Sequence, residues 1–206
     1  MSKHIPMLFS PLMVEALCTG KKSLTRRLNF KGSVGDIIWA KENYYQWGYW
    51  ITETMGAEGE HKIKQTFIPD NFVPYPILYE APEVVLHRSI ALSSMKGYYK
   101  RSALFMPKSA SRLSLEVTEV RDENLIDISD EDCLLEGIIR KNSSTRNDNF
   151  KNYTLCYNYL WDGKSDDKWF VHPRQSFFSL WKLINGEDSL SNNPKVKVVC
   201  FKQIKP

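Results

Sequence analysis

The segment from Gly20 to Arg27 gathers the residue types in this chain that are most able to do chemistry. It reads Gly-Lys-Lys-Ser-Leu-Thr-Arg-Arg, so four cations and two hydroxyls fall within eight residues. Cations attract an anionic or polar ligand, and hydroxyls orient it. The same residues would also suit a solvated turn, because cations after a helix are stabilised by the negative end of its dipole. The segment alone leaves both interpretations open.

Short predicted elements position this segment. Residues 7–9 predict a strand, after which Ser10 is the expected N-cap and Pro11 the first position of a helix. Gly20 is expected to end that helix. The basic segment therefore leaves the C-terminal end of a short helix, and a further strand is predicted over 37–42.

Clearer periodicities follow in the second half of the chain. Residues 112–121 alternate apolar and polar side chains as a strand does, and the phase breaks before Val120, which indicates a bulge. Ser129 begins a capping-box pattern that predicts a short helix. An amphipathic helix over 174–185 and a closing strand over 196–201 complete the predicted elements.

These elements predict an α+β fold, a small mixed β-barrel with short flanking helices. Strands and helices do not alternate regularly, which disfavours a parallel doubly wound sheet. Two loop-rich insertions are expected, at about 44–110 and 140–170, and the first is predicted to hold one or two strands without a second core. The whole chain, 1–206, is thus interpreted as a single domain with two insertions.

Composition narrows the classes of function. The formal net charge is +4, which permits a polyanionic partner without requiring one. The four cysteines are scattered without a Cys-x-x-Cys motif and the four histidines are isolated, so no metal site is expected and the thiols are expected to be reduced in a cytoplasmic protein. No membrane span is predicted. No Gly-x-Gly-x-x-Gly or Walker loop is present, so no cofactor is expected.

Taken together and in order, several motifs resemble the ASCH domain family, relatives of the PUA fold, in the extended form seen in phage and prophage proteins. The motifs that carry the resemblance are 20–26 (GKKSLTR), 35–42 (GDIIWAKE), 105–112 (FMPKSASR), 117–121 (VTEVR), 125–132 (LIDISDED), 136–138 (EGI), 177–186 (FFSLWKLING) and 193–194 (NP). The two insertions lie largely outside the resemblance.

The resemblance implies a β-barrel with a cleft lined by the basic loop, associated with binding RNA or modified nucleosides. One small bacterial branch of the family hydrolyses the acetyl amide of N(4)-acetylcytidine with a Lys, a Thr and a Glu. Aligned by motif, these fall on Lys22, Thr25 and Glu136. The resemblance therefore implies an amidohydrolase site formed by these three residues.

Each of the three has an alternative role. Lys22 acts as a base only if burial or neighbouring cations lower its pKa, and is otherwise a solvated or phosphate-contacting cation. Thr25 is either a nucleophile or a turn residue that bonds its own backbone. Glu136 lies at a predicted helix end, where its charge is unfavourable unless it pairs with a cation such as Lys22. The other candidate ligand-binding residues are Lys21, Arg26, Arg27, Trp39, Glu42, Tyr44 and Arg112.

The leading hypothesis is a basic cleft that binds a nucleobase, a nucleoside or single-stranded RNA, with RNA preferred over DNA, and that hydrolyses an acylated cytidine. Arg26 and Arg112 would anchor a phosphate or a carbonyl, and Tyr44 would stack on a base, whereas Trp39 is more typical of a core. The alternatives are a non-catalytic nucleic-acid module and a phage accessory protein that binds a host protein through aromatics at 44–50. The sequence gives no indication of the oligomeric state.

Overall fold

The computed structural model describes residues 2–55, 62–70, 75–89, 94–143, 153–164 and 168–204, and it divides the chain into two compact units. The central unit consists of Met1–Ala40 and Leu113–Pro206, and the inserted unit consists of Lys41–Arg112. The chain leaves and re-enters the central unit at one point, where the Ala40 amide donates a 3.1 Å hydrogen bond to the Leu113 carbonyl.

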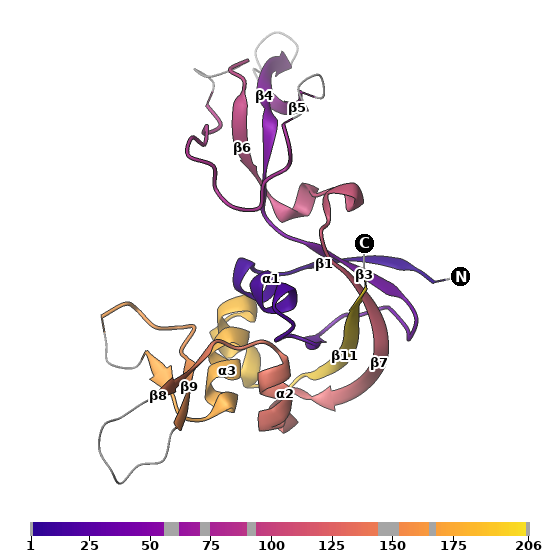
Figure 1. Cartoon of the computed structure of the whole chain (residues 1–206), viewed down its shortest axis with the longest axis vertical. Coiled ribbons are helices and arrows are strands. Elements are labelled where there is room, and N and C mark those ends of the chain that lie inside the picture. The colour runs from indigo at the N-terminus through magenta and orange to yellow at the C-terminus, as the bar shows by residue number, and fades with distance from the viewer. Residues whose placement is uncertain are drawn as a thin grey trace. The chain divides into compact units, whose positions relative to one another are not determined.

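A five-stranded sheet forms the frame of the central unit. Its strand order is β1-β3-β7-β11-β2, and β11 pairs antiparallel with both β7 and β2. The bounds are β1 (His4–Leu8), β2 (Leu24–Arg27), β3 (Ile37–Lys41), β7 (Ser114–Asn124) and β11 (Lys195–Ile204). Figure 1 shows β7 and β11 curving around the side on which the helices of this unit lie.

The predicted bulge is confirmed in this sheet. Glu119 pairs with Cys200 and Val117 pairs with Phe201, so Thr118 is the extra residue on β7. A bulge bends a strand and increases its twist, which fits the curvature of β7.

Three helices cover the sheet, with bounds α1 (Pro11–Cys18), α2 (Asp130–Leu135) and α3 (Pro173–Asn185), and short 3-10 turns follow as η3 (Leu125–Asp127) and η4 (Glu187–Leu190). The expected caps are present, because the Ser10 and Ser129 hydroxyls each accept a hydrogen bond from the amide three residues on. Burying each Leu, Val or Phe of the shared core contributes about 1.5–3 kcal/mol. The best-buried members of this core include Val14, Leu17, Ile38, Leu115, Val117, Leu125, Phe177 and Val199.

A second, small sheet belongs to the predicted 140–170 insertion. It has the order β10-β9-β8, with bounds β8 (Arg140–Ser143), β9 (Tyr153–Tyr157) and β10 (Trp169–Phe170). The remainder of that predicted insertion, 144–152 and 165–167, lies outside the described residues.

The inserted unit differs from the sequence expectation of one or two strands without a core. Its described residues form three strands, β4 (Tyr44–Met55), β5 (Lys62–Pro69) and β6 (Gly97–Arg101), in the order β5-β4-β6, followed by the turns η1 (Ala103–Phe105) and η2 (Lys108–Ala110). A small cluster of buried residues lies beside the sheet, formed by Tyr44, Met106 and Ala110. The expectation was wrong because the aromatic run at 44–50 does not alternate in hydropathy and therefore did not predict a strand. In the structure this run is the first part of β4.

The α+β class is confirmed, and none of the three sheets closes on itself within the described residues. No helix in the described part of the chain is both long and apolar enough to cross a bilayer.

Candidate active site

A cavity of about 410 Å³ in the central unit contains the predicted catalytic residues. Lys22, Thr25 and Glu136 all line it, although Glu136 is more than 100 positions away in the sequence. The remaining lining residues are Leu8, Phe9, Ser10, Met13, Arg26, Arg27, Leu28, Phe177, Leu180, Trp181, Ile184 and Asn185. The cavity is therefore apolar over most of its wall and polar where β2 meets the end of α2.

Backbone geometry brings Lys22 and Glu136 together. The two residues form an isolated antiparallel bridge, and the Ser23 amide donates a 3.0 Å hydrogen bond to the Leu135 carbonyl. Gly137 follows the cap of α2 with a φ of 81°, and a Cβ there would lie 2.9 Å from the Cβ of Lys22. Glycine is needed at this position both for its backbone conformation and for this close approach.

Lys22 and Glu136 form a buried ion pair. The Lys22 Nζ donates to Glu136 Oε2 at 2.6 Å and to the Glu136 carbonyl at 2.7 Å, and the two side chains are 2% and 5% exposed. Two of the three hydrogens on the ammonium nitrogen are thus donated to Glu136. The expectation that Glu136 pairs with a cation is confirmed.

Burial lowers the pKa of the Lys22 ammonium, because the charged form loses its hydration. The Glu136 carboxylate acts in the opposite direction, and the nearby Arg27 and Arg26 guanidinium groups lower the pKa further. A lysine serves as a general base only when part of it is neutral, and burial shifts the pKa of Lys22 in that direction.

Glu136 is held from a second side by Arg26. Its Oε1 accepts a 2.8 Å hydrogen bond from the Arg26 backbone amide, and the Arg26 Nη1 lies 3.6 Å away. Both carboxylate oxygens are therefore fixed, which gives the group one orientation in the cavity.

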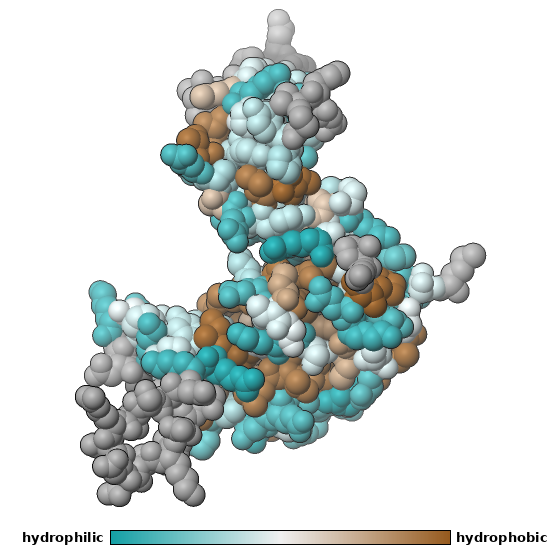
Figure 2. All heavy atoms as spheres, in the orientation of Figure 1, coloured by the Kyte–Doolittle hydropathy of each residue, from teal (hydrophilic) through white to brown (hydrophobic). Residues whose placement is uncertain are grey.

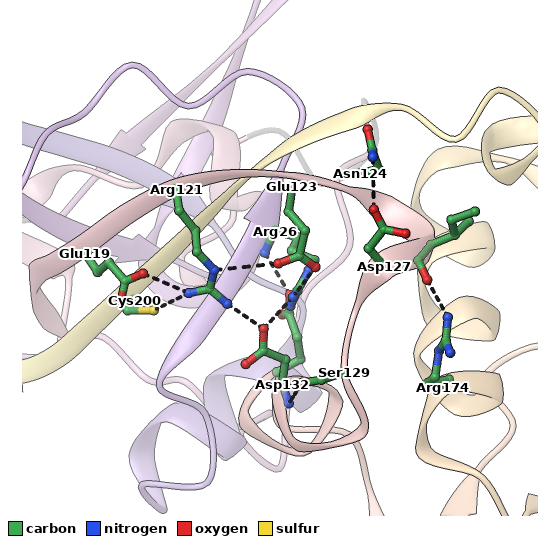
Figure 3. Close-up of polar contacts among 12 residues, drawn as sticks. Arg26, Glu119, Arg121, Glu123, Asn124, Asp127, Ser129, Asp132, Arg174 and Cys200 are labelled. Atoms are coloured by element: carbon green, nitrogen blue, oxygen red, sulfur yellow. Dashed lines mark hydrogen bonds and ion pairs between the residues drawn. The ribbon is translucent and has the colours of Figure 1, made fainter.

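The Arg26 side chain is itself fixed by a network of charges, shown in Figure 3. Its Nη2 donates to Asp132 at 2.6 Å and to Glu123 at 2.8 Å, and Arg121 donates to the same Asp132 oxygen at 2.6 Å. Burial opposes the Arg26 charge, but the hydrogen bonds to Glu123 and Asp132 outweigh it and raise the pKa of Arg26. Figure 3 shows Arg26 and Arg121 pointing toward the same carboxylates from different strands.

Several hydrogen-bond donors in the cavity wall have no acceptor among the described residues. The Nε and Nη1 of Arg26, the Nε of Arg27 and the Nε1 of Trp181 are buried without a hydrogen bond among the described residues. Arg27 also packs over the Phe9 ring at 5.2 Å and donates to the Leu8 carbonyl at 2.8 Å. Buried polar groups are normally paired, so these donors are available to an acceptor group that enters the cavity.

Thr25 lies on β2 and is 4% exposed. The residue belongs to a strand, in contrast to the expected alternative of a turn threonine bonded to its own backbone. The side chain lines the same cavity as the Lys22–Glu136 pair.

The other predicted ligand residues lie elsewhere. Lys21 lines a different cavity, and Trp39 is half-buried on β3 and outside the first cavity. Glu42 and Arg112 belong to the inserted unit, where Arg112 donates from Nε and Nη2 to the two Glu42 carboxylate oxygens at 2.8 and 2.9 Å. Tyr44 is 2% exposed in the small cluster of that unit, so it offers no open ring face for stacking.

Several residues of the site were not expected from the sequence. The capping pattern accounted for Asp132 only as part of the start of α2, whereas its side chain also pairs with two arginines. Arg121 and Glu123 lie two positions apart on β7, and such spacing places both side chains on one face of a strand. This spacing is visible in the sequence and could have indicated that the two residues lie side by side. Phe177 and Trp181 were expected only as the apolar side of a helix and also line the cavity.

The arrangement places an amine, a hydroxyl and a carboxylate in one largely apolar cavity. Within the described residues, no group of three or more His, Cys, Asp and Glu side chains could hold a metal ion; His61 lies outside them. All four cysteines are free thiols. No family model, curated protein or solved structure matches this chain.

Proposed function

We propose that this chain is an amidohydrolase of the ASCH type, related to the PUA fold, that removes the acyl group from an N(4)-acylated cytidine. The observation that carries the proposal is the buried Lys22–Glu136 pair, which lines one cavity together with Thr25. These are the three residue types that the family resemblance predicts at these positions. The curved sheet of the central unit would be the counterpart of the family's barrel.

The proposed chemistry begins at Thr25. Neutral Lys22 accepts the proton of the Thr25 hydroxyl, or of a water molecule, as the oxygen attacks the acyl carbonyl carbon. The bond between that carbon and the N4 nitrogen then breaks, and the proton that Lys22 accepted passes through the Glu136 carboxylate to the leaving amine. If Thr25 is the nucleophile, water hydrolyses the resulting ester, so the products are cytidine and the carboxylic acid.

The remaining wall suits the rest of such a substrate. A volume of about 410 Å³ lies in the range of small-molecule sites. Phe9, Phe177 and Trp181 provide aromatic surface for a base. The unpaired donors of Arg26 and Trp181 would pair with its carbonyl oxygens.

The test is to incubate the protein with N(4)-acetylcytidine and to follow the release of cytidine. We expect turnover in the wild type and a loss of at least about 100-fold in Lys22→Met and Glu136→Gln, since removing a positioned acid or base typically has that effect. Lys202→Met is the matched control, because this lysine is exposed on β11 and does not line the cavity. Absence of turnover, or unchanged turnover in both site variants, would refute the enzyme proposal.

Thr25 variants distinguish the two possible nucleophiles. Thr25→Ser keeps the hydroxyl and Thr25→Val keeps the shape of the side chain. Activity in the serine variant alone indicates attack by the Thr25 oxygen, whereas activity in both indicates attack by water.

A further inference from the structure

The inserted unit carries two arginines that lie against the same aromatic ring. The guanidinium carbon of Arg88 is 4.8 Å from the centroid of the Trp50 ring, and that of Arg101 is 5.2 Å from it. Arg101 also lies 4.0 Å from the centroid of Phe67, which is directly opposite Trp50 where β4 pairs with β5. Since directly opposite residues point to one face of a sheet, the four side chains form a cation–aromatic cluster on one face.

Neither arginine of this cation–aromatic cluster forms an ion pair with a residue that the structure describes. Arg88 donates from Nε to the Gln65 side-chain oxygen at 2.6 Å, and the Nε of Arg101 is buried without an acceptor among the described residues. Arg112 of the same unit, in contrast, is bound to both carboxylate oxygens of Glu42. Contact with a ring stabilises the charge of a guanidinium but gives its N–H donors no acceptor oxygen. The cluster therefore has donors available for an oxyanion.

The charge of the inserted unit indicates which oxyanion suits the cluster. Residues 41–112 contain nine Lys and Arg side chains and seven Asp and Glu side chains, so the unit lacks the large basic excess of a surface that follows a phosphate backbone. A guanidinium group binds a single carboxylate through two parallel hydrogen bonds, without a wider basic surface. Where Figure 1 labels β4, β5 and β6, Figure 2 shows pale and hydrophilic side chains over much of the surface, which favours a polar ligand.

We infer that the cation–aromatic cluster binds an extended acidic segment of a partner protein, with one carboxylate on each guanidinium group. Alternate residues of an extended chain point the same way and are about 7 Å apart, a spacing that suits two cations in contact with one ring. The rings of Trp50 and Phe67 hold the guanidinium groups in place, so less side-chain freedom is lost on binding. This interaction belongs to the inserted unit alone and does not depend on the proposed hydrolysis.

The test is fluorescence anisotropy of the full chain with a labelled peptide of alternating glutamate and threonine. The double variant Arg88→Gln/Arg101→Gln is expected to weaken binding roughly 10-fold or more, because it removes charged hydrogen bonds to both carboxylates. Arg88→Gln alone, at an exposed position, is expected to weaken binding about 3-fold. This single variant keeps the test valid if the half-buried position 101 does not tolerate glutamine.

The matched control is Lys64→Gln/Lys100→Gln, which removes the same amount of charge from the same unit. Lys64 and Lys100 are exposed, and each precedes a residue whose side chain lies on the face of the cluster. Since successive residues of a strand point to opposite faces, both lysines lie on the other face of this sheet. The control is expected to change affinity less than about 2-fold.

Three results would overturn the inference. The first is the absence of binding of the glutamate peptide, or equal binding of a peptide with glutamine in place of glutamate. The second is an equal loss of affinity in the site and control variants. The third is binding of a single-stranded oligouridylate of equal charge that matches the peptide in affinity and in its loss on Arg88→Gln/Arg101→Gln, which would assign the cluster to phosphates instead. Turnover of an acylated cytidine is not measured here, so the proposed function stands or falls separately.

Discussion

Replacing both Lys22 and Glu136 is expected to destabilise the central unit no more than replacing either one alone. Lys22→Met leaves the Glu136 carboxylate buried with no ammonium, and Glu136→Gln leaves the Lys22 ammonium buried with only neutral oxygen partners. Breaking a buried ion pair in this way costs about 3–5 kcal/mol, because a buried charge loses its nearest partner. The double variant removes both charges, so its loss should be about that of one single variant or less.

The measurement is native-state hydrogen exchange of the amides in β7 and β11, which reports the opening free energy of the central unit separately from the inserted unit. A double-mutant cycle should give a coupling energy of about 3 kcal/mol. The exposed pair Lys197–Asp122 serves as the control, with a coupling energy of about 0.2–1 kcal/mol. A coupling energy for Lys22–Glu136 no larger than the control would refute the view that the two side chains form a strongly coupled buried pair.

The same pair predicts the sign of a pH effect on stability. The pKa of Lys22 is lower in the folded chain than in the unfolded chain, where it is near 10.5. Between these two values the unfolded state binds one more proton, so stability rises with pH through that window. The double variant, which lacks the amine, should lose this part of the rise, and an unchanged profile would contradict the lowered pKa.

Two further substitutions test how the site is positioned. Gly137→Ala should lower the free energy of unfolding by about 3 kcal/mol, because this position combines a positive φ with a Cβ only 2.7 Å from that of Ala16. Gly163→Ala, also at positive φ but in open space, should lower it by about 1–2 kcal/mol. Thermal unfolding measures both values. Equal losses would show that the close approach is not important. Ser129→Ala should destabilise α2 by about 1 kcal/mol in urea unfolding through loss of the N-cap, and Ser191→Ala, at an exposed position, should change stability by less than about 0.5 kcal/mol. A Ser129 loss no greater than that of Ser191 would contradict the capping role.

Local signals in the sequence predicted the parts of the fold that depend on neighbouring residues. The caps at Ser10 and Ser129 and the bulge near Thr118 follow from side chains within a few positions. The pairing of Glu136 with a lysine was also predictable, because a carboxylate at a helix C-terminus is unfavourable without a cation.

The contacts that could not be predicted depend on which side of an extended segment each residue faces. Successive residues of an extended chain point to opposite sides, and the sequence does not show which of Lys21 and Lys22 faces the first cavity. The partners of Arg26 lie about 100 positions away, on β7 and α2, so no local pattern reveals them. Tyr44 was expected at a ligand surface because aromatic residues serve both cores and binding sites, and burial decides between the two.

The junction at Ala40 and Leu113 has a consequence for how this protein can be engineered and could have evolved. Ala40 and Leu113, which flank residues 41–112, are hydrogen-bonded to each other, and Glu42 and Arg112 form an ion pair just inside that junction. Residues 41–112 therefore form an insertion between two neighbouring antiparallel strands. A short turn in its place would reconnect β3 to β7 without lengthening either strand. The central unit, with the cavity that Lys22, Thr25 and Glu136 line, could then be produced without residues 41–112, and different segments could be inserted at the same point.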